Sequence, residues 1–146
     1  MKVLFLDFDG VLNTDLYVRN KNRYGVILEP SKMILLKDII EKTQAKIVIH
    51  TSWRRYWSQK AIHWIGKDIN EIFLQYGLWI DDKTSDRLNR KESIEEYIKR
   101  YDIKQFVVVD DIYIDSYLIK NSFVRTQSVY GLTNELAKDI INKLGG

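Results

Sequence analysis

Short, continuous runs of apolar residues alternate along the chain with longer segments in which apolar residues recur every three or four positions. Runs of the first kind are typical of strands buried on both faces of a parallel sheet, and segments of the second kind are typical of amphipathic helices. The predicted strands occupy residues 3–6, 45–50, 78–80, 104–109 and 122–126. The predicted helices occupy residues 31–43, 58–76 with a break near Gly66, 90–100 and 134–144, and a turn or short helix is expected at 112–120.

Strands separated by helices of this length form βαβ units, and right-handed crossovers arrange such units into a doubly wound parallel sheet. The sequence therefore predicts an α/β, Rossmann-like fold of about five parallel strands with helices on both faces, although it does not define the strand order. The 146 residues, of which 45% are hydrophobic, fit a single domain over residues 1–146. A polar, turn-rich insert at residues 14–30 is expected to form a flap over the ligand crevice.

Composition excludes several kinds of site. The chain has no cysteine and only two histidines, so disulfides and thiolate metal sites are excluded and a zinc centre is not expected. A net charge of +3 is compatible with an anionic ligand without demanding nucleic acid. Because neither a signal-like N-terminus nor a membrane-length apolar run is present, a cytoplasmic protein without membrane contact is expected.

Two carboxylates follow the first predicted strand directly. Asp7 and Asp9 stand two residues apart, so on an extended backbone their side chains point the same way. A second pair, Asp110 and Asp111, follows the strand at 104–109. The carboxyl ends of parallel strands form the ligand crevice of open α/β sheets, so the four acids are expected to gather there. Clustered carboxylates repel unless a cation lies between them, and oxygen ligands favour Mg²⁺.

A less specific interpretation exists for these acids. An Asp-x-Asp-Gly sequence also occurs in turns, where Asp and Gly supply tight backbone geometry. The apolar strand before Asp7 and the matching acids later in the chain favour the metal site. Asp115, four residues beyond Asp111, is equally compatible with orienting a metal-bound water and with a surface position on the following turn.

Hydroxyl and basic side chains add candidates for phosphate binding. Thr51 and Ser52 follow the second strand and precede a helical segment, where hydroxyl and backbone N–H groups can bind phosphate oxygens; helix capping is the alternative. Arg90 and Lys91 begin the helix before the fourth strand, where a cation opposes the helix dipole and a ligand would explain its presence. Either residue can supply the cation that phosphoryl transfer needs, and the sequence does not choose between them.

Taken together, these segments resemble the four motifs of the haloacid dehalogenase-like (HAD) superfamily of phosphohydrolases. The four segments are Asp7-Phe8-Asp9-Gly10-Val11-Leu12-Asn13, Ile47-Val48-Ile49-His50-Thr51-Ser52, Arg90/Lys91 and Val107-Val108-Val109-Asp110-Asp111. Within the superfamily, three further stretches look most like the small domain of Swiss army knife RNA repair proteins, namely Thr51-Ser52-Trp53-Arg54, Arg90 to Ile98 and Gly131-Leu132-Thr133. The phosphatase half of polynucleotide kinase-phosphatases is a more distant likeness.

The resemblance implies Mg²⁺-dependent hydrolysis of a phosphate ester through an aspartyl phosphate. It assigns the nucleophile to Asp7, and it gives Asp9 the task of protonating the leaving oxygen and later activating water. Mg²⁺ would be held by the Asp7 carboxylate, the Asp9 backbone carbonyl and Asp111. Asp9 favours phosphoryl transfer over dehalogenation, because dehalogenating members lack this second acid.

The remaining implied roles concern phosphate and the substrate. Thr51 with the Ser52 amide would bind phosphate, assisted by Arg90 or Lys91. Large members of the superfamily carry a cap domain that closes over small metabolites, whereas the insert here has only about sixteen residues. This minimal cap predicts an open cleft, which suits a macromolecular or polynucleotide end.

Three residues next to the second motif bear on the substrate. Trp53, Arg54 and Arg55 interleave an aromatic ring with cations, a composition that can stack bases and contact phosphates. Packing of the tryptophan into the core with solvated arginines fits the pattern as well.

Three functions follow from the sequence. The favoured one is a Mg²⁺-dependent phosphatase acting on a terminal phosphate of a nucleotide or polynucleotide. The alternatives are a phosphatase of a small phosphorylated metabolite and a non-catalytic nucleic-acid-binding module on the same fold. The sequence defines neither the phosphate end that is recognised nor the oligomeric state.

Overall fold

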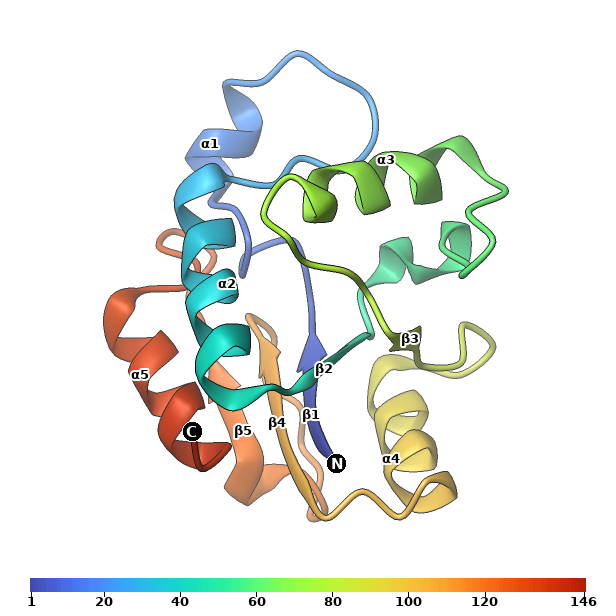
Figure 1. Cartoon of the computed structure of the whole chain (residues 1–146), viewed down its shortest axis with the longest axis vertical. Coiled ribbons are helices and arrows are strands. Elements are labelled where there is room, and N and C mark those ends of the chain that lie inside the picture. The colour runs from blue at the N-terminus through green and yellow to red at the C-terminus, as the bar shows by residue number, and fades with distance from the viewer.

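A computed structural model describes residues 1–146 as a five-stranded sheet in the order β3-β2-β1-β4-β5, in which every neighbouring pair is parallel (Figure 1). The strands are β1 (Lys2–Leu6), β2 (Lys46–Ile49), β3 (Asp82–Lys83), β4 (Gln105–Asp110) and β5 (Phe123–Arg125). The α-helices are α1 (Asp15–Arg19), α2 (Pro30–Thr43), α3 (Trp64–Leu74), α4 (Arg90–Arg100) and α5 (Asn134–Lys143), and the 3₁₀ helices are η1 (Ser52–Tyr56) and η2 (Lys120–Ser122). None of the helices has both the length and the apolar character to cross a bilayer.

Two hydrophobic clusters cover the two faces of the sheet. Successive side chains of β1 point to opposite faces, so Leu4 and Leu6 join one cluster while Val3 and Phe5 join the other. Helices α2, α3 and α5 pack on the face of Leu4, and α4 packs on the face of Val3 together with the loop between β4 and β5. The predicted α/β fold with about five parallel strands and helices on both faces is confirmed.

The strand order places a topological switch point between β1 and β4. The chain leaves β1 through α2 and pairs next on one side, as β2, whereas it leaves β4 toward the opposite edge, as β5. The two connections diverge above the carboxyl ends of the neighbouring strands β1 and β4. Open α/β sheets bind ligands in the crevice at this point, and Asp7 and Asp110 stand on its two sides.

Some details of the predicted secondary structure are wrong. Helix α3 runs unbroken through Gly66, because this glycine lets the helix pack closely on η1: a Cβ here would lie 2.5 Å from the carbonyl oxygen of Tyr56. The strand predicted at 78–80 is displaced to Asp82–Lys83, since Leu78 and Ile80 pack into the core instead of pairing with β2. The segment at 112–120, predicted as a turn or short helix, is a loop with a turn at 117–119 that leads into η2.

The insert at residues 14–30 lies beyond the carboxyl ends of the strands (Figure 1). It contains the one-turn helix α1 and is attached to the rest of the molecule at both sides. The Asp15 N–H group donates to the Ser128 carbonyl at 3.1 Å, and Arg23 pairs with Asp68 of α3 at 2.5 Å. The insert is therefore attached to the segment after β5 and to α3.

Candidate active site

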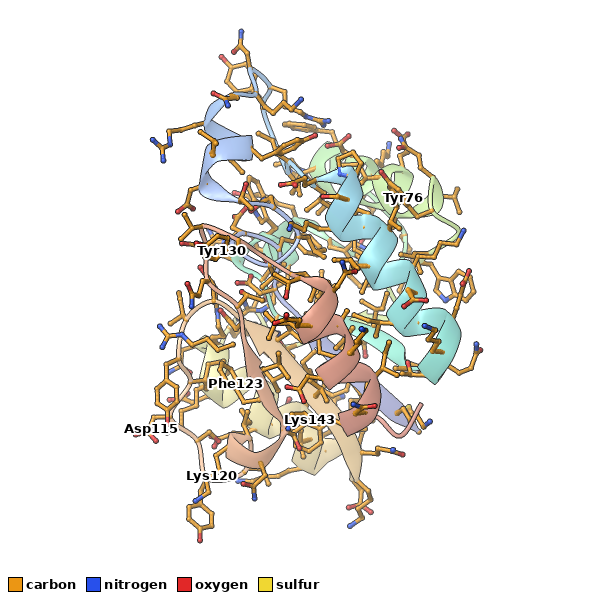
Figure 2. All side chains as sticks on the ribbon, turned by 90° about the vertical axis from the view of Figure 1, so that its left-hand side faces the viewer. Tyr76, Asp115, Lys120, Phe123, Tyr130 and Lys143 are labelled. Atoms are coloured by element: carbon orange, nitrogen blue, oxygen red, sulfur yellow. The ribbon has the colours of Figure 1, made fainter.

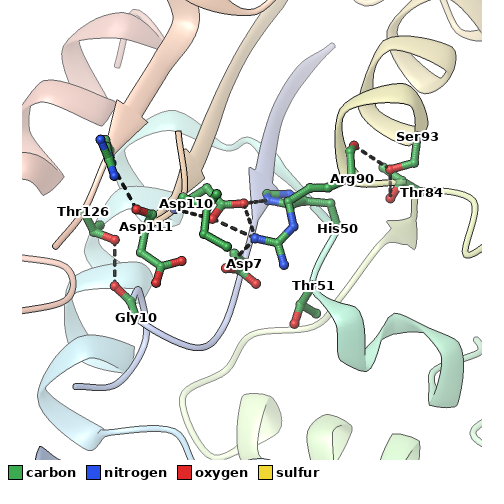
Figure 3. A network of polar contacts seen from close by, with 12 residues as sticks. Asp7, Gly10, His50, Thr51, Thr84, Arg90, Ser93, Asp110, Asp111 and Thr126 are labelled. Carbon is green, nitrogen blue, oxygen red and sulfur yellow. Dashed lines mark hydrogen bonds and ion pairs between the residues drawn. The ribbon is translucent and has the colours of Figure 1, made fainter. Parts of the chain in front are cut away.

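Three acidic side chains meet at the switch point. Asp7 follows β1, Asp110 ends β4 and Asp111 comes next, and one oxygen from each carboxylate lies within 4.8 Å of the other two (Figure 3). Asp7 and Asp110 are buried, whereas Asp111 is partly exposed. Residues about a hundred positions apart in the sequence thus share one small volume at the edge of the sheet.

The fourth predicted acid, Asp9, lies apart from this group. Its side chain is exposed and accepts two hydrogen bonds, one from Asn13 Nδ2 and one from Trp53 Nε1, both at 3.0 Å. These bonds fix the Asp9 carboxylate at the solvent side of the site, outside the group of three acids. The position suits proton exchange with a bound group better than direct metal ligation by this carboxylate.

Asp110 and Asp111 differ in how far their oxygens are already engaged. Asp110 Oδ1 accepts from the Ile112 N–H group at 2.9 Å, Oδ2 lies 2.8 Å from His50 Nε2, and Arg90 Nη1 lies 2.8 Å from both oxygens. The Asp111 carboxylate accepts no hydrogen bond from any N–H group of the protein and is free to bind a ligand. Asp110 thus holds the side chains of His50 and Arg90 in place, whereas the Asp111 carboxylate faces the site.

Gly10 permits this close arrangement. Its backbone has φ +80°, a left-handed conformation that glycine adopts readily, and a Cβ at this position would lie 2.4 Å from Asp111 Oδ2. The Gly10 carbonyl accepts a 2.6 Å hydrogen bond from the buried Thr126 hydroxyl, which ties the loop after β1 to the end of β5. The glycine of the first motif is therefore required by the approach of Asp111.

Of the two basic candidates, only Arg90 enters the site. As the first residue of α4 it extends to Asp7 Oδ2 at 3.3 Å and to Asp110 at 2.8 Å. Lys91 is exposed and makes no ion pair. The Asn89 side chain caps α4 by accepting from the Glu92 N–H group at 2.8 Å, which holds the helix start and Arg90 in place.

The acids carry more negative charge than Arg90 offsets. Burial, together with repulsion from Asp110, raises the pKa of Asp7 to about 8. Burial, a hydrogen bond with Asp110 and repulsion from it raise the pKa of Asp111. Burial also acts against ionisation of Asp110, but the contacts with His50, the Ile112 N–H group and Arg90 together outweigh it and lower the pKa of Asp110 to about 2. A cation between Asp7 and Asp111 would favour both carboxylates, so the hard oxygen donors and the excess charge fit a divalent metal.

The hydroxyl candidates follow β2. Thr51 is buried beside the site (Figure 3). Its Oγ1 accepts a long 3.4 Å hydrogen bond from the Trp53 N–H group at the start of η1. Ser52 is exposed. The capping contact and the location at the site, posed as alternatives from the sequence, thus coexist at Thr51.

The three residues predicted to contact substrate occupy different environments. Arg54 is only 7% exposed, and its guanidinium donates to four backbone carbonyls, those of His50, Thr51, Ser85 and Leu88. This placement contradicts substrate binding by Arg54, because the side chain instead joins the end of β2 to the loop before α4. Arg55 is exposed, and Trp53 lies against Asp9.

Two buried polar residues of the site were not predicted from the sequence to have a role in it. His50 is fully buried against Asp110, and Asn13 donates to Asp9 while its Oδ1 accepts from the Gly10 N–H group at 2.9 Å. Their signal was a polar residue directly beside an apolar strand or turn, where burial demands a partner. Asp115, by contrast, is exposed on the loop after Asp111 and points away from the molecule, as its surface alternative required (Figure 2).

Comparison with known proteins agrees with the fold. A family model described as the HAD domain in Swiss Army Knife RNA repair proteins matches residues 3–137. The fold is similar to the crystal structure of D,D-heptose 1.7-bisphosphate phosphatase from B. bronchiseptica complexed with magnesium and phosphate, with a TM-score of 0.61 at 17% identity over 99% of both chains. It is also similar to a putative HAD superfamily (subfamily III A) hydrolase from Legionella pneumophila, with a TM-score of 0.50 at 16% identity over 99% of this chain and 84% of that one. No protein of curated function matches the chain by sequence.

Proposed function

The chain belongs to the family of HAD domains in Swiss Army Knife RNA repair proteins, and we propose that it is a Mg²⁺-dependent phosphatase. The substrate would be a nucleotide or polynucleotide that carries a terminal phosphate. The observation that carries the proposal is the meeting of Asp7 and Asp111 beside Arg90 at the switch point, with Asp9 held at its solvent side.

The proposed reaction begins with attack of an Asp7 carboxylate oxygen on the phosphorus atom. The bond from phosphorus to the leaving oxygen breaks, and Asp9 gives that oxygen a proton, which leaves an aspartyl phosphate and a free alcohol. Asp9, now a carboxylate, then takes a proton from water as the water oxygen attacks phosphorus. The bond between Asp7 and phosphorus breaks, inorganic phosphate leaves and both acids return to their starting states.

Other side chains position these two acids and the phosphoryl group. Arg90 lies 3.3 Å from Asp7 and supplies a fixed positive charge for the phosphoryl oxygens, while Thr51 offers its hydroxyl from the neighbouring strand. Asn13 and Trp53 orient the Asp9 carboxylate through their 3.0 Å hydrogen bonds. Such prior orientation lowers the entropic cost of the reactive arrangement.

The metal would be held by the Asp7 and Asp111 carboxylates together with the Asp9 backbone carbonyl. We assign Asp110 the task of anchoring Arg90, because both of its oxygens are already engaged. When bound, Mg²⁺ supplies positive charge that favours the ionised form of Asp7 and withdraws charge from the phosphoryl oxygens.

The proposal is tested by hydrolysis of a generic aryl phosphate. Activity is expected with Mg²⁺, and it should disappear on chelation with EDTA and return when Mg²⁺ is added again. Asp7→Asn, which removes the nucleophile, is expected to lower the activity by at least about a thousandfold. Asp115→Asn is the matched control, because this exposed acid lies outside the site. Full activity of Asp7→Asn, or activity indifferent to metal, would refute the mechanism.

A substrate panel distinguishes the two phosphatase alternatives. Oligonucleotides phosphorylated at the 3′ or 5′ end, mononucleotides and sugar phosphates are compared by kcat/KM with the same enzyme preparation. The short insert, with only the five-residue helix α1, supports preference for an oligonucleotide end over a small sugar phosphate. Preference for sugar phosphates would favour the small-metabolite alternative, which the likeness to a heptose bisphosphate phosphatase raises.

A further inference from the structure

Four aromatic rings form a row that begins beside the catalytic acid. Trp53, Tyr56, His63 and Trp64 follow one another with ring-centroid separations of 6.3, 4.8 and 6.1 Å, and the last two rings are stacked with an interplanar angle of 26°. We call these four residues the aromatic row. It joins η1 to the start of α3, two elements that Gly66 allows to lie in close contact.

The row starts where the leaving group of the proposed reaction must lie. Trp53 Nε1 donates to Asp9 Oδ2 at 3.0 Å, and Asp9 is the residue proposed to protonate the leaving oxygen. The part of the substrate attached to that oxygen therefore emerges next to the Trp53 ring. For a phosphorylated nucleic-acid end, this part is the terminal sugar with its base.

The far end of the row is open to solvent. Trp64 is 56% exposed and His63 is also exposed. Gly25 of the insert lies against the edge of the Trp64 ring, within 3.4 Å of where its own Cβ would stand. The aromatic row thus runs from the reacting atoms to the border of the insert.

The segment that carries the row is basic. Residues 53–67 contain four basic residues and no acidic one. Three of the four, Arg55, Lys60 and Lys67, are exposed and form no ion pair. An aromatic surface with unpaired cations next to it is complementary to a single-stranded nucleic acid, because bases stack on the rings and phosphates meet the cations.

We propose that the aromatic row binds the terminal nucleotides of a single-stranded nucleic acid whose end phosphate lies at Asp7. This inference rests on the proposed function and adds to it the surface that recognises the substrate. The row continues over three rings beyond Trp53, which exceeds what one nucleoside covers, so affinity is expected to rise with strand length over the first few nucleotides and then level off.

The main test compares Trp64→Ala with the wild-type chain. The KM for a phosphorylated single-stranded octanucleotide, divided by the KM for an aryl phosphate, is expected to rise about five- to a hundredfold, the loss that removal of one stacking ring causes. Trp64→Phe is expected to restore most of the loss, since it keeps a ring. Trp79→Ala is the matched control, because Trp79 is 67% exposed, lies on the segment before β3 and pairs with none of the four rings.

A second measurement does not depend on turnover. Fluorescence anisotropy follows binding of Asp7→Asn to a labelled octanucleotide, to an abasic strand of equal length and to polyglutamate of equal charge. The octanucleotide is expected to bind at least about tenfold more tightly than the other two, because only it offers bases for stacking. Equal binding of the abasic strand or of polyglutamate would overturn the proposal, since the surface would then respond to charge alone or accept an acidic protein.

The outcomes separate this inference from the proposed function. An enzyme that hydrolyses no phosphate monoester with Mg²⁺ would refute the proposed function. An enzyme that hydrolyses the aryl phosphate, but whose oligonucleotide KM ignores both strand length and Trp64→Ala, would refute the aromatic row and leave the chemistry standing.

Discussion

The buried hydrogen bond between His50 and Asp110 offers a test of how the site is held together. His50 is 0% exposed, and the only hydrogen bond of its imidazole joins Nε2 to Asp110 Oδ2 at 2.8 Å, while Nδ1 has no partner. Burial lowers the pKa of His50, so the folded chain holds a neutral imidazole that donates its Nε2–H to the carboxylate. His50→Leu removes this donor and replaces it with a side chain of similar volume.

The structure sets the size of the expected loss. A hydrogen bond to a charged group contributes about 1.5–3 kcal/mol, and Asp110 keeps its contacts with Arg90 and the Ile112 N–H group. We therefore expect His50→Leu to lower the free energy of unfolding by about 2 kcal/mol at pH 7. For a chain of this size, where each kcal/mol shifts Tm by about 2–4 °C, that corresponds to a Tm lower by about 4–8 °C.

The same contact predicts how the loss depends on pH. The unfolded chain binds a proton at His50 below pH about 6.5, whereas the folded chain resists it because the folded pKa is lowered. The stability contributed by the neutral imidazole is present above pH 6.5 and is lost as pH falls, by up to about 1.4 kcal/mol per pH unit. His50→Leu lacks this dependence, so its deficit relative to wild type should narrow between pH 7 and pH 5.

Urea unfolding followed by circular dichroism at pH 5, 6 and 7 measures both effects, and the difference between variants cancels the titrating groups whose pKa does not depend on His50. His63→Leu alters the only other histidine and should retain the wild-type slope, because it leaves His50 in place. A deficit that stays constant or widens toward pH 5 would show that His50 is not buried in the neutral form. An unchanged free energy of unfolding at pH 7 would refute a stabilising hydrogen bond between His50 and Asp110.

Two further substitutions test neighbouring parts of the site. Arg54→Met removes a buried guanidinium that donates to four carbonyls, so it should lower the free energy of unfolding, measured in urea, by about 3 kcal/mol. Arg55→Met, at the exposed next position, should change this free energy by less than about 0.5 kcal/mol. Similar losses at both positions would contradict the structural role of Arg54. Gly10→Ala places a Cβ 2.4 Å from Asp111 Oδ2 on a backbone with a left-handed φ of +80°. It should therefore lower the free energy of unfolding by at least about 1 kcal/mol and raise the Mg²⁺ concentration needed for half-maximal activity. An unchanged Mg²⁺ titration would contradict the placement of Asp111 in the metal site.

Sequence patterns predicted the features that depend on neighbours along the chain. The apolar runs located β1 and β4, the period of Ile94 and Ile98 located α4, and the fold class followed from their alternation. They failed where a contact with a distant segment decided the outcome. Gly66 suggested a helix break, yet its lack of a side chain serves packing against the Tyr56 carbonyl, and residues 78–80 have strand-like composition because they fill the core.

The candidate site shows the same division in its chemistry. The adjacent Asp110 and Asp111 are indistinguishable in sequence, but the end of β4 directs Asp110 toward His50 and Arg90 and Asp111 toward the loop at Gly10. Two neighbouring positions thus differ in role: Asp110 anchors other side chains, and Asp111 can bind a ligand. Arg54 and Arg55 divide likewise into a buried donor and an exposed cation. Residue type and spacing can thus name the members of a phosphoryl-transfer site, whereas the role of each member follows from which of its polar atoms the fold has already engaged.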